Sequence, residues 1–432
     1  MRIKNIRGRP FRFVISAASI ACLAALASAC GGSSSNGGDD DDDGQGDPSD
    51  PDNGEVSGDL PDFFESATVS SHGEFQSALD DASEYSPDDE DVEEGAAFLI
   101  EMSEDIEDGF DENGALTYDG NVSLYIRGDT TMRTLDAGGH SRILEIDSIP
   151  GDDDVRIWIS ETRFTGGVID DGSFEYGGAI HSDHHLVVED SEFANNMAPE
   201  ASGGAVYCHG DVEIRNTSFS GNSSGERGGA VYMTDGSAEQ LIVDSDFSDN
   251  EAGHSGGAIY AEEVTVHDSV FTDNEAVSSV RYDRGGGAIH ASGGEINGSE
   301  FSGNTADLIA GAVLHYYLTS LDIADSEFTE NRAGNRGGAI GVFENGSTNV
   351  DDSDISVNVE NSVFDSNGHP SGGVIDGGAI IVSAGQGAVD IVSADSSFID
   401  NDAPPLVVDT GELVDEGGNT FEPEDDRPDE WN

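Results

Sequence analysis

Two short motifs alternate along residues 160–401, and their spacing restricts the fold more than any other feature of the chain. The first motif is Phe-x-x-Asn, and the second is Gly-Gly-Ala followed by Ile or Val. From Phe164 to Phe398 the first motif recurs at an average interval of about 29 residues. Repeats of this length are typical of solenoids, in which one repeat cannot bury its apolar face alone and must stack on its neighbours.

The copies are regular, and a Ser or Thr stands two residues before every Phe. A degenerate first copy begins at Phe164, and the complete copies are Phe193/Asn196, Phe219/Asn222, Phe247/Asn250, Phe271/Asn274, Phe301/Asn304, Phe328/Asn331, Phe364/Asn367 and Phe398/Asn401. Complete copies of the second motif begin at Gly177, Gly203, Gly228, Gly256, Gly286, Gly337 and Gly377.

Alternating apolar residues precede each aromatic motif, as in Val212-x-Ile214 and Leu321-x-Ile323. A period of two over a few residues indicates a strand, and no stretch of ten residues in the repeats has a helical period. The repeats therefore predict an all-β fold. It is a parallel β-helix with one rung per repeat, in which equivalent residues lie about 4.8 Å apart.

Each fixed position of the repeat is expected to form a ladder of equivalent residues. Phe should form an internal aromatic stack, and Ser or Thr an inward row of hydroxyl groups. Asn suits a left-handed turn residue whose amide bonds the amide of the next rung. Gly-Gly permits positive φ and close backbone approach. The distance from Phe to Gly-Gly varies, which indicates loops inserted at that turn.

This pairing of motifs resembles the repeats of the polymorphic outer-membrane proteins of chlamydiae and of related bacterial right-handed β-helix proteins. The resemblance covers about residues 120–401. It implies a right-handed, single-stranded parallel β-helix of the pectin-lyase-like type. Those proteins end in a membrane β-barrel, whereas about 30 residues follow the last Asn motif here. We therefore expect a lipid to replace the barrel as the membrane anchor.

The N-terminus predicts export and anchoring. Residues 1–12 are basic and residues 13–29 are apolar and small, which are the two parts of a secretory signal peptide. The segment Leu26-Ala-Ser-Ala-Cys30 resembles a bacterial lipobox, although Ala27 stands where Leu is usual, and it implies lipidation of Cys30. Gly31 after the cysteine implies the outer membrane. Ordinary cleavage after Ala29, which would release a soluble protein, is the alternative.

The charge of the chain restricts its partners. Its formal net charge is −72, from 17 basic and 89 acidic residues, and no Lys follows Lys4. Binding to DNA or RNA depends on Lys and Arg that neutralise phosphates, so the composition excludes nucleic acid as a partner.

An amphipathic helix is expected to cap the N-terminal end of the solenoid, before its first strand. Ser71-His-Gly-Glu74 has the form of a capping box, and Phe75, Leu79 and Ala82 lie on one helical face with Ala78. The predicted segments are a signal peptide (1–29), lipidated Cys30 with a disordered acidic tether (30–60), the N-terminal cap (61–95), the β-helix repeat domain (96–421) and an acidic tail (422–432).

One aromatic residue per rung follows Ala-Ile or Ala-Val in five successive copies. These residues are His181, Tyr207, Tyr232, Tyr260 and His290. Their parity is opposite to that of the core Ile and Val, so we expect an exposed stripe, with the rings about 4.8 Å apart. Such a candidate glycan stripe would stack against sugar rings. A cross-strand ladder that only stabilises the sheet is the alternative.

The sequence predicts no catalytic residues. Polysaccharide lyases of this fold use Lys or Arg as the base, and the close arginine pairs, Arg281/Arg284 and Arg332/Arg336, fall in predicted loops. Asp170-Asp171 is an isolated acidic pair.

No metal site is predicted either. A zinc site from the cluster of His181, His184 and His185 with Cys208 and His209 is an alternative. The parity of Cys208, however, predicts a buried apolar residue. Ca²⁺ between stacked acidic residues is a second alternative; they are Asp190, Asp244, Asp268, Asp325 and Asp395, with Asn216 and Asn361 between them.

These patterns favour a surface-exposed or outer-membrane lipoprotein that acts as an adhesin-like interaction protein, without a cofactor or enzymatic activity. The expected partner is a polysaccharide, or the surface of a host or neighbouring cell. A polysaccharide-active lyase or hydrolase and a passive envelope stalk are the alternatives.

Overall fold

The computed structural model describes residues 60–422, apart from 88, 90–91, 94, 148–154, 170–175, 235–239, 279–284, 317–319, 344–354, 371–376, 384–388, 403 and 409–410. The predicted signal peptide, Cys30, the tether up to residue 59 and the tail beyond Glu422 lie outside the described residues, as does the predicted inserted loop with Arg281 and Arg284.

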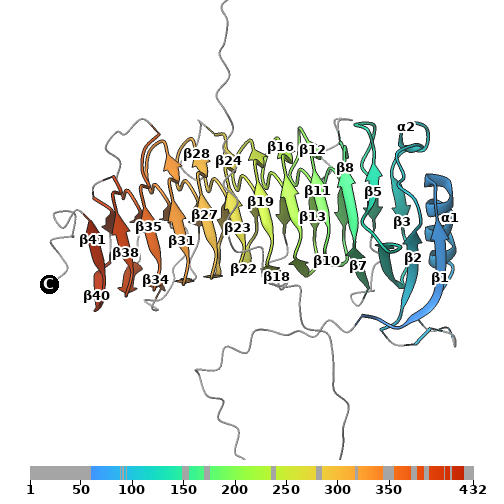
Figure 1. Cartoon of the computed structure of the whole chain (residues 1–432), viewed down its shortest axis with the longest axis horizontal. Helices are drawn as coiled ribbons and strands as arrows, with labels where there is room; N and C mark the ends of the chain where they lie inside the picture. Colours follow the sequence, from blue (N-terminus) through green and yellow to red (C-terminus); the bar gives the residue numbers. More distant parts are fainter. Residues whose placement is uncertain are drawn as a thin grey trace, which may run out of the picture. The chain divides into compact units, whose positions relative to one another are not determined.

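The described chain winds through four parallel sheets, which run side by side along a solenoid (Figure 1). Sheet A holds β1 (Phe63–Val69), β2 (Ala97–Met102), β4 (Ser123–Gly128), β7 (Arg156–Ser160), β10 (His185–Glu189), β14 (Val212–Arg215), β18 (Gln240–Val243), β22 (Glu263–His267), β26 (Gly293–Asn297), β30 (Leu321–Ala324), β34 (Ile355–Glu360), β37 (Val389–Ala394) and β40 (Leu413–Gly417).

Sheet B contains the Phe of each aromatic motif. Its strands are β5 (Arg133–Asp136), β8 (Thr162–Thr165), β11 (Glu192–Ala194), β15 (Ser218–Ser220), β19 (Asp246–Ser248), β23 (Val270–Thr272), β27 (Glu300–Ser302), β31 (Glu327–Thr329), β35 (Val363–Asp365), β38 (Ser397–Ile399) and β41 (Thr420–Glu422).

Sheet C follows the Gly-Gly turns, and the short sheet D follows the Asn residues. Sheet C comprises β3 (Leu116–Tyr118), β6 (Leu144–Ile146), β9 (Ile180–Ser182), β13 (Val206–Cys208), β17 (Val231–Met233), β21 (Ile259–Tyr260), β25 (Ile289–Ala291), β29 (Val313–Tyr316), β33 (Ile340–Phe343), β36 (Ile380–Ser383) and β39 (Leu406–Val408). Sheet D comprises β12 (Met197–Ala198), β16 (Ser223–Ser224), β20 (Glu251–Ala252), β24 (Glu275–Ala276), β28 (Thr305–Ala306) and β32 (Arg332–Ala333).

The order A, B, D, C within a rung, with every pairing parallel, is that of a right-handed parallel β-helix, as predicted. Successive rungs pair equivalent repeat positions, such as Phe193 with Phe219 and Val206 with Val231. The apolar residues of all rungs merge into one buried core that runs the length of the solenoid.

The predicted aromatic stack fills that core on the sheet B side. Its rings belong to Phe164, Phe193, Phe219, Phe247, Phe271, Phe301, Phe328, Phe364 and Phe398. Neighbouring rings have centroids 4.7 to 5.2 Å apart and planes within 10° of parallel. Phe421 extends the stack by one ring, at 5.1 Å from Phe398. A further partial rung of β40 and β41 therefore follows the rung of the last Phe-x-x-Asn copy, which β39 completes.

The Asn residues form the predicted amide ladder, fully buried from Asn196 to Asn331. The side-chain Nδ2 of Asn274 donates to Oδ1 of Asn304 in the next rung (3.0 Å) and to the backbone carbonyl of Phe247 in the previous rung (2.9 Å). Its Oδ1 accepts from Nδ2 and from the backbone N–H of Asn250. One side chain thus satisfies polar groups of the previous and the next rung and links three rungs.

The same bonds continue towards both ends of the ladder. Nδ2 of Asn222 donates to Oδ1 of Asn250, and Nδ2 of Asn367 to Oδ1 of Asn401, both at 3.0 Å. Asn401 is the last member, and its Nδ2 donates to the backbone carbonyl of Phe364 at 2.8 Å. The amide-to-amide bonding predicted from the motif therefore holds from Asn196 to Asn401.

The prediction that these Asn residues adopt the left-handed conformation is wrong in every copy. It fails at Asn196, Asn222, Asn250, Asn274, Asn304, Asn331, Asn367 and Asn401. Positive φ occurs instead one residue earlier in each rung, at Asn195, Gly221, Asp249, Asp273, Gly303, Glu330, Ser366 and Asp400. The bend precedes the Asn because its side chain must point inward to reach the next amide, so the preceding residue takes the unfavourable backbone conformation.

The Ser/Thr and Gly-Gly positions behave as predicted. From Ser191 to Ser396, each inward hydroxyl accepts the backbone N–H of the equivalent residue in the previous rung, as Ser245 does from Thr217 (3.2 Å). In the Gly-Gly pair, Gly203 has a φ of +70°, and a Cβ on Gly204 would lie 2.0 Å from the carbonyl oxygen of Gly229. Only glycine fits at the second position.

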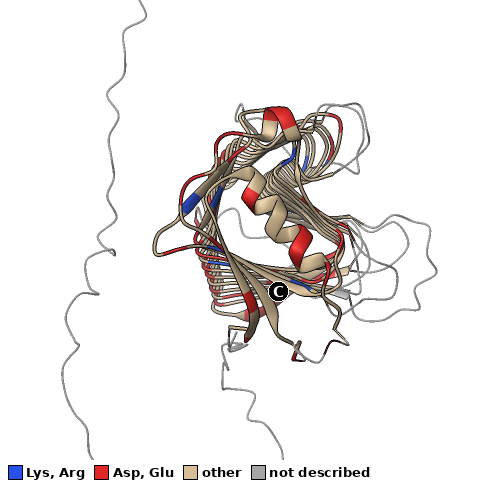
Figure 2. Cartoon of the chain, turned by 90° about the vertical axis from the view of Figure 1, so that its right-hand side faces the viewer, with Lys and Arg blue, Asp and Glu red and all other residues tan. Residues whose placement is uncertain are grey.

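Helix α1 (His72–Ser83) closes the N-terminal end of the solenoid, and Figure 2 shows it lying across that end. Its buried residues include the predicted Phe75, Ala78, Leu79 and Ala82. The helix does not precede the first strand, because β1 comes before it and pairs in parallel with β2. A second, four-residue helix, α2 (Phe110–Asn113), brings the Phe110 ring to 4.8 Å from that of His72.

The N-terminal capping differs in one detail from a reciprocal capping box. The Ser71 side chain accepts the backbone N–H of Glu74, as expected. The Glu74 carboxylate, however, accepts from the backbone N–H and hydroxyl of Ser70 rather than from the backbone of Ser71.

Replacement of Asn274 by Ala should destabilise the solenoid by roughly 3–5 kcal/mol, because it removes four hydrogen bonds and leaves buried donors and acceptors unsatisfied. Urea unfolding of the variant and the wild type measures the difference. Thr272→Ala, on the outer side of the same rung, is the matched control and should cost less than about 1 kcal/mol. Equal effects of the two substitutions would contradict a structural role for the amide ladder.

Candidate functional site

The five residues of the predicted stripe stack in register on sheet C. His181 pairs with Tyr207, Tyr207 with Tyr232, Tyr232 with Tyr260, and Tyr260 with His290. Their ring centroids are 4.7, 5.8, 5.4 and 4.6 Å apart in that order. Since the adjacent Ile and Val residues face the core, these rings lie on the outer side of the sheet.

The first four rings are half-buried, and residues from the turns extend the aromatic surface. The Tyr176 ring stacks on Tyr207 with centroids 4.9 Å apart, and the Arg227 guanidinium lies 4.9 Å from the centroid of Tyr260. Burial raises the pKa of Tyr207 and of Tyr232, so both phenols stay protonated and neutral at physiological pH. The sequence motif identified neither Tyr176 nor Arg227.

The stripe ends at His290, whose side chain is buried. Its Nδ1 has no hydrogen-bond partner, and the next rung continues with Leu314 in place of an aromatic residue. Burial, with smaller effects of Arg227 and His315, lowers the pKa of His290 to about 3. The accessible part of the stripe therefore runs from His181 to Tyr260.

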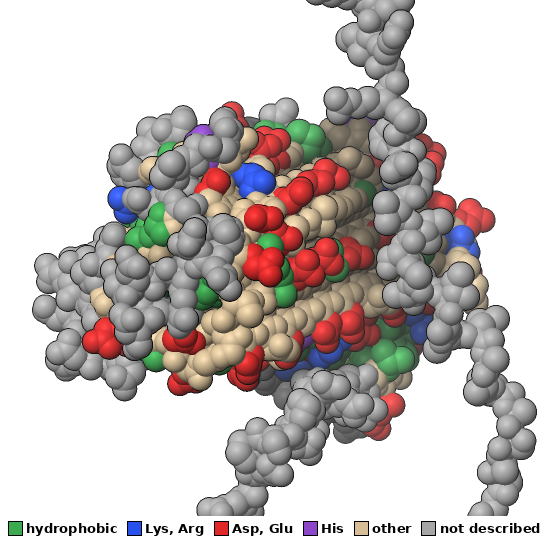
Figure 3. All heavy atoms as spheres, turned by 60° about the vertical axis from the view of Figure 1, so that its left-hand side comes forward, with side chains coloured by type: hydrophobic (Ala, Val, Ile, Leu, Met, Phe, Trp, Pro, Cys, Tyr) green, Lys and Arg blue, Asp and Glu red, His purple; other side chains and the backbone are tan. Residues whose placement is uncertain are grey.

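Acidic side chains form rows along the outside of the solenoid (Figure 3). The predicted Asp190, Asp244, Asp268, Asp325 and Asp395 all have positive φ at the bend between sheets A and B. The Asn residues between them relieve repulsion, because the Asn216 amide donates to Asp190 and the Asn361 amide to Asp325.

A second acidic row follows sheet B. Here burial, with the neighbouring carboxylate of Asp249, raises the pKa of Asp273. On the adjacent sheet D, burial and the carboxylate of Glu251 raise the pKa of Glu275 in the same way. Stacking in register thus places like charges next to one another on consecutive rungs.

Cys208 is fully buried and pairs with Ser182 and Met233, as its parity predicts. Its thiol donates to the backbone carbonyl of His184 at 3.2 Å, and burial raises its pKa to about 12. Among the described residues, Cys208 and the nearby histidines do not form a group of metal ligands.

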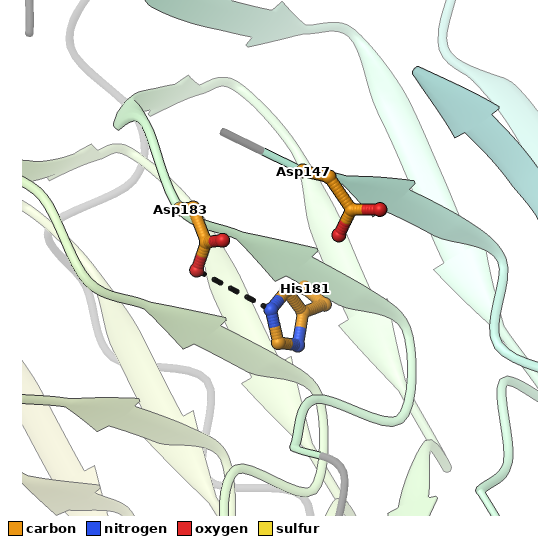
Figure 4. Close-up of side chains that lie close together, drawn as sticks. All are labelled: Asp147, His181 and Asp183. Atoms are coloured by element: carbon orange, nitrogen blue, oxygen red, sulfur yellow. Dashed lines mark ion pairs between the residues drawn. The ribbon is translucent and has the colours of Figure 1, made fainter. Parts of the chain in front are cut away.

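The described part of the chain has a different group with metal-ligand chemistry, which consists of Asp147, His181 and Asp183 (Figure 4). One ligand atom of each lies within 4.8 Å of the other two. Asp147 directly follows β6, and the other two residues come from β9 and the position after it.

Of the two close arginine pairs, only Arg332/Arg336 lies among the described residues, and both side chains are partly buried. The Arg332 guanidinium donates to the backbone carbonyls of Ser366 and Asn331, so it supports the turn. Asp170 and Asp171 lie outside the described residues.

Comparison with protein families finds the Chlamydia polymorphic membrane protein repeat at residues 216–234 and 244–262. Each match spans a sheet B strand, the Asn of the amide ladder, the Gly-Gly turn and a stripe tyrosine. The chain carries polymorphic membrane protein repeats in a parallel β-helix. No curated protein and no solved structure matches it significantly.

Proteins with these repeats are outer-membrane or surface proteins, which supports a surface or outer-membrane location and an adhesin-like class for this chain. Within the described residues, no helix is both long enough and apolar enough to cross a membrane.

Acid should destabilise the protein partly through His290. Its pKa is about 3 in the folded chain and about 6.5 in the unfolded one, so below pH 6.5 the unfolded state binds a proton that the folded state does not. The stability due to neutral His290 is complete above pH 6.5 and is lost as the pH falls towards 3, by about 2 kcal/mol at pH 5.

The variant His290→Leu, which carries the residue of the next rung, removes this proton linkage. Urea unfolding at pH 7.5, 6 and 5 should show the wild type losing stability relative to the variant as the pH falls. A constant difference between the two proteins would show that His290 is not titrated on unfolding in this range.

Proposed function

We propose that the protein is a surface lipoprotein, anchored in the outer membrane through lipid on Cys30, that binds glycans of a host or neighbouring cell along the aromatic stripe. The observation that carries the proposal is the ladder of half-buried rings at His181, Tyr207, Tyr232 and Tyr260 on the outer side of sheet C. Aromatic faces combine apolar area with a polar edge, which suits the apolar faces of sugar rings.

The charge of the surroundings favours an uncharged glycan. With a net charge of −72 on the chain and acidic rows along the solenoid (Figure 3), polyanionic polysaccharides are repelled. Arg227, stacked on Tyr260, is a local hydrogen-bond donor at the stripe. Stacking on successive rungs offers several equivalent contacts to one chain, so weak individual contacts add up to useful avidity.

We also propose that this role is binding without catalysis. Arg332 donates to backbone carbonyls and Arg142 pairs with Glu145, so these arginines serve the turns and are not placed as bases.

Glycan binding should be lost when Tyr207, Tyr232 and Tyr260 are all replaced by Ala, because each ring supplies a stacking surface. A glycan array identifies the bound sugars, and calorimetry then measures an expected loss of at least tenfold in affinity, about 1.4 kcal/mol. The matched control replaces Glu213, Leu241 and Thr265 by Ala, since these half-buried residues face outward on the three sheet A strands that directly follow the strands of the tyrosines.

Circular dichroism should show that both triple variants stay folded. Unchanged binding by the tyrosine variant would refute the stripe as the binding surface. A wild-type chain that binds no glycan on the array would favour the passive stalk.

The anchor is tested separately in a bacterial host that lipidates proteins. Wild-type protein should incorporate labelled palmitate and partition into the detergent phase, whereas Cys30→Ser should do neither, because the cysteine is the acceptor. Gly31→Asp, which keeps the cysteine, is the control and should still be labelled. A wild-type chain that remains in the aqueous phase without label would contradict lipidation.

A further inference from the structure

Asp147, His181 and Asp183 come together because two consecutive rungs stack in register. Ile146 of β6 pairs with Ser182 of β9, so the two aspartates that follow these strands occupy equivalent positions. The backbone N–H of Asp183 donates to the carbonyl of Ile146 at 3.1 Å, which fixes this alignment. His181 points outward from β9, and its Nε2 lies 3.5 Å from Oδ1 of Asp183 (Figure 4).

The other ring nitrogen of His181 sets its tautomer. Nδ1 lies 3.3 Å from the backbone carbonyl of Tyr176, and a carbonyl only accepts, so Nδ1 carries the proton in this bond. In the neutral ring, the Nε2 lone pair then points towards the carboxylates. A histidine that donates one N–H to a carbonyl and offers its other nitrogen to a ligand set is the usual arrangement at metal sites.

Arg142 fixes the position of the Tyr176 carbonyl, which accepts the His181 hydrogen bond. Its buried guanidinium donates to the carbonyls of Tyr176 (3.1 Å) and Gly177 (3.1 Å). It also pairs with Glu145 at 3.0 Å, the residue that lies beside His181 in the register. The Glu145 carboxylate is thereby held by Arg142, while those of Asp147 and Asp183 remain beside the imidazole.

We propose that Asp147, His181 and Asp183 bind one Zn²⁺ ion. An imidazole lone pair beside two carboxylates is repulsive, and a divalent cation between them converts that repulsion into coordination. Zinc is bound by His nitrogen and Asp oxygen at about 2.0–2.2 Å, which places the ligand atoms about 4 Å or less apart. Atoms that already lie within 4.8 Å need only small side-chain rotations.

The imidazole favours Zn²⁺ over Ca²⁺ or Mg²⁺, which prefer ligand sets made only of oxygen. With three protein ligands and a side-chain exposure of 17% at His181 and 32% at Asp183, the remaining position is open to water. The ion would link two rungs near the N-terminal end of the solenoid. The inference does not depend on glycan binding.

Equilibrium dialysis of the full chain against Zn²⁺, with excess Ca²⁺ to occupy the acidic surface, should give one tight zinc per chain. His181→Tyr should weaken binding at least tenfold, and so should Asp183→Asn. Tyrosine is the residue at the three following stripe positions, so this variant keeps the ring stack and should fold normally. X-ray absorption should show nitrogen and oxygen ligands at about 2.0–2.2 Å and no sulfur at about 2.3 Å.

Asp244→Asn is the matched control, since it removes the same charge from an acidic row and places there the residue found at Asn216. Its zinc affinity should equal that of the wild type. The proposal is overturned if Asp244→Asn weakens binding as much as Asp183→Asn, if His181→Tyr still binds zinc, or if Ca²⁺ displaces all of the zinc.

Discussion

The buried amide ladder is the interaction on which the rest of this structure depends. Each Asn of the Phe-x-x-Asn motif bonds a backbone carbonyl of the previous rung and, up to Asn367, the amide of the next one, inside a core that excludes water. A rung that slipped by one residue would leave several buried donors and acceptors unsatisfied, which costs far more than a misplaced apolar contact. The parallel phenylalanine stack beside it buries further apolar area. A shift of one residue would turn a ring from the core to the outer face of sheet B. Together they fix one register from Phe164 to the last rungs.

Much of this could be predicted from sequence, because a ladder needs the same residue at the same place in every rung. The Phe, Ser/Thr and Gly-Gly positions were assigned correctly for that reason. The left-handed residue was misplaced by one position, because many residue types occupy it: Asn195, Asp249 and Glu330 share only their backbone conformation. Sheet D was missed because its strands have two residues, although the buried Ala of Asn-x-Ala, as at Ala252 and Ala276, was a usable signal. Strand β1 lies outside the repeats and carries no motif.

The candidate sites divide in the same way. The aromatic stripe could be located from sequence alone, because successive side chains of a strand point to opposite faces. Once Ile and Val are known to face the core, the residue after each of them must face outward. Tyr176 and Arg227 contact the stripe from turns, where side chains do not alternate regularly, so the sequence pattern could not identify them. Asp147 belongs to a rung without the Gly-Gly motif, so it could not be aligned with Asp183 until the pairing of β6 with β9 was known. The retrospective signal is the match of Leu144-Glu-Ile-Asp147 with Ile180-His-Ser-Asp183.

The same register that stacks aromatic rings also stacks charges, and this explains how the surface is composed. An acidic residue at a fixed outer position would face its copy in every rung, so a uniform row would repel itself along the whole solenoid. The chain interrupts such rows with amides, as at Asn216 and Asn361, or with Gly298. Each of the two amides donates to the carboxylate of a neighbouring rung, and Gly298 leaves its position without a charge. Where acids remain adjacent, as at Asp249 and Asp273, burial and, to a smaller extent, repulsion from the neighbouring carboxylate raise the pKa of Asp273. At physiological ionic strength the Debye length is roughly 8–10 Å, so dissolved salt largely screens the repulsion between distant members of a row. Acids on adjacent rungs, about 4.8 Å apart, lie within that length and are screened only in part, so the amides between them matter most.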